Sequence, residues 1–146
     1  MKTQKVTRFI KSSDADKKWF LVDAQDQVLG RLATKVARII RGKNKAIFTP
    51  NSDTGDFVVV VNADKVKLTG KRATLKTYSH HSGYPGGLKT KSLREVMANK
   101  PEFVVQNAVQ GLLPKNRLGK QLIKKLKVYS GSVHPHAAQK PESVNL

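Results

Sequence analysis

Residues 19–61, WFLVDAQDQVLGRLATKVARIIRGKNKAIFTPNSDTGDFVVVV, decide the fold. The two ends of this stretch, Trp19–Asp23 and Phe57–Val61, are short apolar runs, and the second is apolar at every position, as in a central strand covered on both faces. Between them, apolar residues recur at helical spacing over residues 29–40, and Gly42 follows as a C-terminal cap. Strand, helix and strand in this order predict a βαβ unit with parallel strands.

The sequence on the C-terminal side predicts shorter elements around this unit. Residues 76–80 form a third extended piece, which either joins the sheet or leaves it. Ser92 and Glu95 make a capping box that opens a short helix to about Asn99, and Pro101 suits the first turn of the next helix. We expect that second helix to bury an apolar face made of Phe103, Val104, Ala108, Val109 and Leu112. Residues 128–129 are a candidate final strand.

These elements predict an α/β fold in a single compact domain. A small, mostly parallel sheet is built on the βαβ unit, and helices, basic loops and extensions flank it. We assign residues 1–16 to a basic N-terminal extension, residues 17–129 to the α/β domain and residues 130–146 to an irregular C-terminal tail.

The charge balance points to a polyanionic partner. The 146 residues include 28 Lys and Arg against 10 Asp and Glu, a net charge of +18, which favours nucleic acid or an anionic membrane surface. After Asp64 the acids are only Glu95, Glu102 and Glu142, so residues 65–127 are almost purely cationic. No apolar run reaches the length of a bilayer span, and the N-terminus lacks the apolar run of a secretory signal. The absence of cysteine excludes thiolate sites and fits a reducing cytoplasm.

Residues 111–131, GLLPKNRLGKQLIKKLKVYSG, contain the strongest cationic pattern. If a helix begins at about Asn116, one narrow stripe carries Arg117, Lys120, Lys124 and Lys127. The opposite side carries Leu118, Leu122 and Leu126. Because neighbouring cations repel one another along a helix, we interpret the stripe as a surface that a polyanion neutralises. The alternative is a solvated lysine-rich face.

Residues 76–91, KTYSHHSGYPGGLKTK, are a second candidate contact. Gly83, Gly86 and Gly87 allow a close approach of the backbone to a ligand. Tyr78 and Tyr84 offer flat faces on which unpaired bases stack, and the histidines and lysines hydrogen-bond phosphates and 2′-hydroxyls. We therefore interpret this segment as an RNA contact, with a merely structural loop as the alternative.

Catalytic and metal sites have weaker support. His80, His81, His134 and His136 form two pairs that could in principle hold a metal, but neither pair has i,i+4 spacing. Residues 53–55, DTG, precede an apolar strand instead of following one, so we interpret them as a turn and not as an aspartic protease motif. Gly70 and Lys71 lack the rest of a P-loop, and Asp23 fits a capping role better than a catalytic one.

A set of motifs, taken together, carries a family resemblance. They are Trp19, Asp23 and Ala24, then VLGRLA at 28–33, RGKNK at 41–45, TP at 49–50, DTGD at 53–56, NADK at 62–65, HSGYPGG at 81–87, LPKNRLG at 113–119, LKVY at 126–129 and HPHAAQ at 134–139. In this order they resemble the family of bacterial large-subunit ribosomal protein thirteen, over nearly the whole chain. The family usually has Gly-Met-Leu-Pro where this chain has GLLP at 111–114, a volume-conserving apolar change.

The resemblance implies a compact α/β domain that binds large-subunit rRNA during assembly and stays in the mature particle. It implies a cytoplasmic, ribosome-bound monomer among neighbouring ribosomal proteins, with no catalysis, cofactor, metal, membrane or small-molecule substrate. From the residues and the resemblance together we predict RNA contacts at Arg41, Lys43, Lys45, Lys71, Arg72, Lys76, Tyr78, His80, His81, Ser82, Gly83, Tyr84, Gly86, Gly87, Lys89, Lys91, Lys115, Arg117, Lys120, Lys124 and Lys127. Two other hypotheses stay open: an enzyme on a nucleotide-binding α/β fold, and a free regulator of mRNA or DNA.

Overall fold

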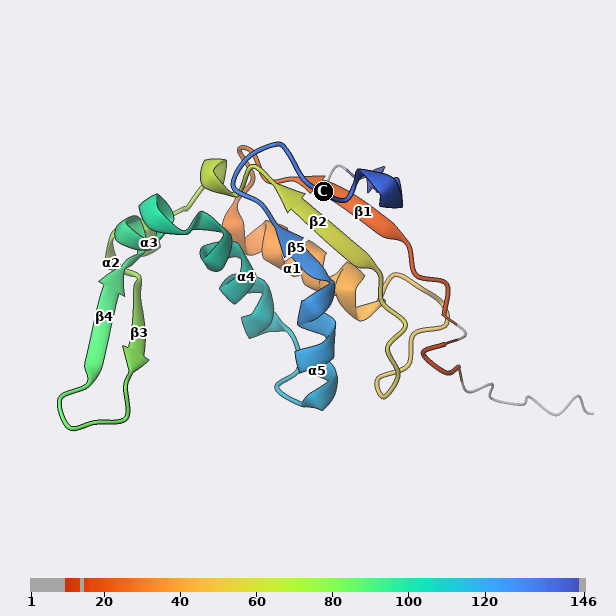
Figure 1. The fold of residues 1–146 in the computed structure, drawn as a ribbon, viewed down its shortest axis with the longest axis horizontal. Helices are drawn as coiled ribbons and strands as arrows, with labels where there is room; N and C mark the ends of the chain where they lie inside the picture. The colour runs from red at the N-terminus through yellow and green to blue at the C-terminus, as the bar shows by residue number, and fades with distance from the viewer. Residues whose placement is uncertain (1–9, 14, 145–146) are drawn as a thin grey trace, which may run out of the picture.

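A four-stranded parallel sheet with helices packed against it forms the body of the protein, and a two-stranded hairpin stands beside it (Figure 1). The structure is a computed structural model that describes residues 10–13 and 15–144. The strands are β1 (Trp19–Asp23), β2 (Phe57–Val61), β3 (Thr77–His81), β4 (Leu88–Ser92), β5 (Leu126–Val128) and β6 (Glu142–Ser143). The α-helices are α1 (Leu29–Arg41), α2 (Arg72–Leu75), α3 (Leu93–Asn99), α4 (Pro101–Leu112) and α5 (Arg117–Leu122). Most of the predicted N-terminal extension lies outside the described residues.

The predicted βαβ unit is confirmed. Strands β1 and β2 run parallel and in register from Trp19 opposite Phe57 to Asp23 opposite Val61, and α1 connects them. The sheet order is β5-β2-β1-β6, and every neighbouring pair in it is parallel. Residues 58–60 of β2 are fully buried, as predicted for a central strand. Helix α1 buries its apolar stripe, and Gly42 ends it in the left-handed conformation with φ 79°.

Helices α3 and α4 carry the chain from the hairpin back to the core. The predicted capping box is confirmed, because the Ser92 hydroxyl accepts a hydrogen bond from the Glu95 backbone N–H at 3.3 Å. The predicted apolar face of α4 is partly wrong, since Phe103 and Leu112 are 46% and 52% exposed. α4 packs against α1 and buries Val104, Val105 and Val109. Phe103 lies on the opposite side of the helix from these valines, and Leu112 is the last residue of the helix.

The long helix predicted from Asn116 to Lys127 is wrong in its second half. Helix α5 ends at Leu122, a 3₁₀ turn covers Ile123–Lys125, and the chain then becomes β5. β5 pairs with β2 in parallel, with Leu126 opposite Val58. A partner strand 68 residues away in sequence, which helical periodicity cannot detect, therefore determines the conformation here. Lys127 consequently leaves the helical stripe and lies half-buried on the strand.

The C-terminal tail is tied to the sheet. It contains a 3₁₀ turn at Ala137–Gln139, and Glu142–Ser143 pairs with β1 as the fourth strand. Trp19 and Phe57 stack at 4.5 Å between ring centroids, and His136 lies 5.2 Å from Trp19. The Tyr129 hydroxyl and the His136 Nε2 are 2.8 Å apart, so an aromatic cluster fixes the segment that leads to β6.

Substitution of Gly55 tests how closely the loop before β2 packs against the end of α1. A Cβ atom added there would lie 1.6 Å from the Ile40 carbonyl oxygen, a backbone atom that cannot move aside. We predict that Gly55→Ala lowers the free energy of unfolding by about 3 kcal/mol or more. The matched control is Gly30→Ala on the exposed side of α1, where nothing lies within 4 Å and alanine stabilises the helix by up to about 1 kcal/mol. Chemical denaturation measures both, and equal stabilities of the two variants would contradict the close packing.

Candidate nucleic-acid interface

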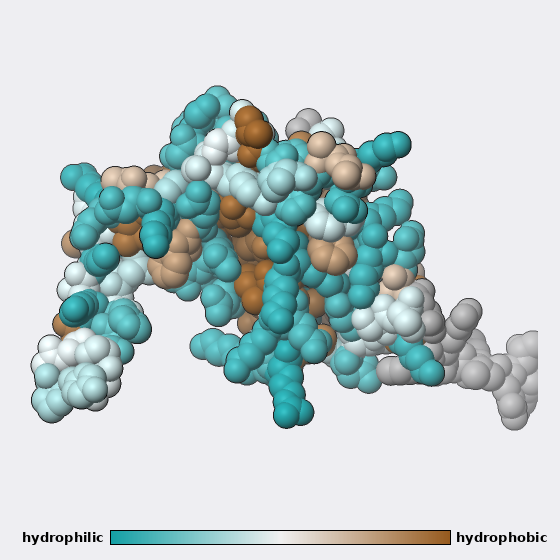
Figure 2. Space-filling view, viewed as in Figure 1, coloured by the Kyte–Doolittle hydropathy of each residue, from teal (hydrophilic) through white to brown (hydrophobic). Residues whose placement is uncertain are grey.

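The hairpin β3–β4 is almost entirely exposed and projects from the body of the protein (Figures 1 and 2). The register places Tyr78 opposite Lys91 and His80 opposite Lys89. Because side chains alternate between the faces of a strand, these four residues share one face of the hairpin. The Lys76 ammonium lies 5.1 Å from the centre of the Tyr78 ring. The structure therefore brings four of the predicted residues onto one face of a projecting hairpin, with Lys76 at its base.

The turn of the hairpin, residues 82–87, holds its shape by backbone contacts. The Ser82 N–H donates to the Gly87 carbonyl at 3.1 Å, and the Gly87 N–H donates to the Tyr84 carbonyl at 2.9 Å. Gly83 and Gly86 take φ of 90° and 71°, which favours glycine at both positions. Tyr84 is 75% exposed at this tip. The loop thus presents an exposed aromatic ring on a hydrogen-bonded backbone.

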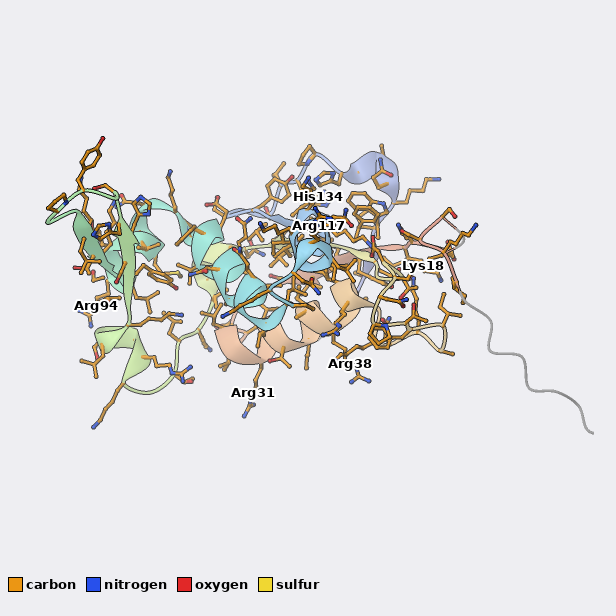
Figure 3. All side chains as sticks on the ribbon, turned by 90° about the horizontal axis from the view of Figure 1, so that it is seen from below. Lys18, Arg31, Arg38, Arg94, Arg117 and His134 are labelled. Carbon is orange, nitrogen blue, oxygen red and sulfur yellow. The ribbon has the colours of Figure 1, made fainter. Side chains whose placement is uncertain are left out.

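The second cationic surface surrounds α5. Lys115, Arg117 and Lys120 are exposed on the helix and just before it, and Lys124 is exposed on the 3₁₀ turn that follows. The Asn116 side chain accepts a hydrogen bond from the Gly119 N–H at 2.8 Å and caps the helix. Figure 3 shows Arg117 on α5, and Figure 2 shows hydrophilic side chains reaching outward from the middle of the molecule. The shortened helix therefore still presents most of the predicted cations.

The other predicted cations differ in their exposure and in whether an acid of the protein pairs with them. Lys71 and Arg72 at α2 and Lys43 after α1 are exposed. Arg41 is half-buried and its guanidinium lies 5.7 Å from the centre of the Phe48 ring. Lys45, by contrast, pairs with the buried carboxylate of Asp56, so an acid of the protein already neutralises its charge. We therefore assign Lys45 a structural role.

A further ion pair near the loop before β2 involves Lys125, which was not among the predicted contacts. Lys125 is buried and pairs with Asp53, and its ammonium also donates to the Gly55 carbonyl at 2.8 Å. Burial lowers the pKa of Lys125, whereas the hydrogen bond that its ammonium donates to Asp53 opposes that shift. Lys17 contacts the other oxygen of Asp53 at 3.5 Å. Residues 53–55 are irregular and directly follow the turn at residues 50–52, and Asp53 and the Gly55 carbonyl hold lysines in place there.

The outer side of α1 carries cations that were missing from the predicted set. Arg31, Lys35 and Arg38 are all exposed, and Figure 3 shows Arg31 and Arg38 pointing away from the body on the same side. Their spacing of four and three residues is the signal that identifies such a face. A shallow groove of about 230 Å³ next to Arg38, Arg41 and Lys43 continues this surface toward Leu112.

The remaining candidate sites have structural explanations. The Asp23 carboxylate accepts hydrogen bonds from the Asn62 side chain and the Gln25 N–H, both at 2.9 Å, and these lower its pKa. Asp23 therefore closes the turn after β1 and does not cap α1, whose N-cap residue is Val28 without a side-chain hydrogen bond. The histidine pairs lie on different elements, the hairpin and the tail, and the described residues contain no group of three His, Asp or Glu able to hold a metal. None of the described helices has the length and apolar character needed to cross a membrane.

Comparison with known proteins identifies the family of the chain. Residues 17–135 match the family described as Ribosomal protein L13. The chain is 59% identical over 132 residues to "Large ribosomal subunit protein uL13" of Maridesulfovibrio salexigens, covering 90% of this chain and 93% of that protein. It is 57% identical over 136 residues to the protein of the same name from Caldanaerobacter subterraneus subsp. tengcongensis, covering 93% and 95%. It is 60% identical over 131 residues to that of Agathobacter rectalis, covering 90% and 92%.

These relatives cover nearly the full chain, so the match includes the βαβ core, the hairpin and α5 together. The family is one of structural ribosomal proteins, which confirms the prediction that the chain is not an enzyme. The resemblance inferred from the motifs is confirmed as well: the chain belongs to the ribosomal protein L13 family.

Proposed function

We propose that the protein binds rRNA of the large ribosomal subunit and organises it during assembly. This proposal rests on which lysines pair with acids of the protein and which remain exposed. Asp53 and Asp56 neutralise the lysines that are buried or half-buried beside them, whereas the hairpin and α5 present cations that are exposed. Unpaired positive charge gathered on two surfaces attracts a polyanion.

Binding proceeds mainly by release of counterions. Each phosphate that a lysine or arginine neutralises steepens the dependence of log affinity on log salt by about 0.7–0.9. The rigid core spaces the hairpin and α5 so that they contact separate phosphates of a folded RNA. The exposed face of α1, with Arg31, Lys35 and Arg38, adds a third surface.

The hairpin contributes recognition of shape rather than of a long sequence. Its tip combines the exposed Tyr84 ring with a glycine-rich backbone, and the strands behind it carry Lys89 and Lys91. A bulged or unpaired RNA segment fits this combination, since an unstacked base can lie on the ring while the phosphates contact the lysines.

The setting that follows is the cytoplasmic ribosome, where the protein is a monomer beside rRNA and neighbouring ribosomal proteins. The competing hypothesis of a free regulator of mRNA or DNA predicts no preference for large-subunit rRNA. Filter binding of the full-length protein to large-subunit rRNA and to an unrelated RNA of equal length separates the two hypotheses. Equal affinities at physiological salt would contradict the proposal.

The α5 surface generates a prediction about salt dependence. Replacing Lys120 and Lys124 with alanine should weaken rRNA binding and flatten the log–log salt slope by between about one and two units, because two phosphate contacts are lost. The control is Lys67→Ala, because that ammonium already pairs with Asp26 at 2.8 Å. Titrations from low to high salt give the slopes, and a double variant with the slope of the control would remove α5 from the interface.

The hairpin tip generates a prediction about stacking. Tyr84→Ala should cost roughly 1–3 kcal/mol of binding free energy if the ring stacks on a base. Tyr84→Phe keeps the flat face and should bind nearly as well as the unmodified protein. Because Tyr84 is 75% exposed, both variants should fold normally, which thermal unfolding checks. Equal losses in both variants would instead indicate that the hydroxyl makes the contact.

A further inference from the structure

A groove of about 540 Å³ separates the hairpin from α3 and the start of α4. Tyr78, His80, Lys89 and Lys91 line one wall, and these are the four residues that the strand register places on a single face. The helical wall includes Phe103. Pockets of about 300–1,000 Å³ are typical of sites for small organic groups, so the groove has room for a single nucleotide.

Phe103 is an aromatic platform in this groove. Its ring meets Tyr78 edge-on, with 5.6 Å between centroids and an interplanar angle of 68°, which limits its orientation. It nevertheless remains 46% exposed. An aromatic ring that is held in place and still exposed is suited to stacking, because little conformational freedom is lost when a second ring covers it.

The charges at the groove identify its occupant. Lys89, Lys91 and Lys100 lie along it, with Glu95 as the only acid among its lining residues. An apolar side chain of a protein would cover Phe103 but leave these ammonium groups without a counterion. A nucleotide brings a flat base and a phosphate in one unit and matches both features.

We propose that this groove receives an unstacked nucleotide of the bound RNA, with its base on Phe103 and its phosphate among Lys89, Lys91 and Lys100. The carboxylate of Glu95 is the acceptor available to an exocyclic amine of that base. This inference rests on the proposed function, and it assigns the hairpin a role beyond its tip: together with α3 and α4 it forms a clamp around one extruded base.

Substitution of Phe103 tests the clamp in the full-length protein with a transcript of large-subunit rRNA. Phe103→Ala should weaken binding by about 5- to 150-fold, the equivalent of roughly 1–3 kcal/mol for one stacked base. The salt slope should not change, since no cation is removed. Phe103→Trp should retain binding, and Phe103→Leu should bind like the alanine variant because it is apolar but not flat. The control is Val133→Ala, an exposed apolar residue in the C-terminal segment outside the proposed RNA surfaces.

The outcomes separate this inference from the proposed function. Wild-type affinity of Phe103→Ala, with a normal salt slope, would overturn the clamp and leave rRNA binding intact. Failure of the unmodified protein to prefer large-subunit rRNA would overturn both. If Phe103→Ala binds naked rRNA normally but enters large subunits poorly, the occupant is a protein, and the nucleotide proposal is wrong.

A second measurement does not depend on the folding of the variants. Ultraviolet cross-linking of the unmodified complex, followed by digestion and mass spectrometry, should find a nucleotide attached to the peptide that contains Phe103. Adducts confined to other peptides would contradict the clamp.

Discussion

The contact of Lys125 with Asp53 and with the Gly55 carbonyl is the constraint on which the rest of the structure depends. It joins the turn before β5 to the loop before β2, two segments 70 residues apart in sequence. A buried ion pair is not by itself a source of stability, but loss of one partner leaves an uncompensated charge in the interior. The pair therefore holds the 3₁₀ turn between α5 and β5 against the loop before β2.

Ion pairing separates the lysines of the protein into two groups. Lys17, Lys45 and Lys125 meet carboxylates near the core, whereas Lys120, Lys124 and the hairpin lysines face outward. Two aspartates of the first half of the sequence, Asp53 and Asp56, neutralise lysines beside the βαβ unit. What remains exposed is a surplus of positive charge on a rigid framework, and the proposed role in the large ribosomal subunit follows from it.

Local patterns predicted the parts of the fold that depend on local physics. The helical spacing in α1, the all-apolar β2 and the Ser92 cap each contain their own signal, and each is confirmed. The prediction that the helix continues to Lys127 was wrong, because the pairing of Leu126 with Val58 is a long-range contact. The structural role of Lys45 was missed for a similar reason, since its partner, Asp56, is brought close only when the loop folds back on α1. The groove at Phe103 could not be predicted, because it exists only between the hairpin and helices that follow it.

The central claim is that RNA covers the hairpin and the α5 surface at the same time. Lysine labelling with a small acylating reagent, read by mass spectrometry with and without large-subunit rRNA, tests it most directly. We expect Lys89, Lys91, Lys120 and Lys124 to be protected together in the complex, with Lys125 unreactive in both states because it is buried. Unchanged reactivity of either surface in a saturated complex would contradict the account.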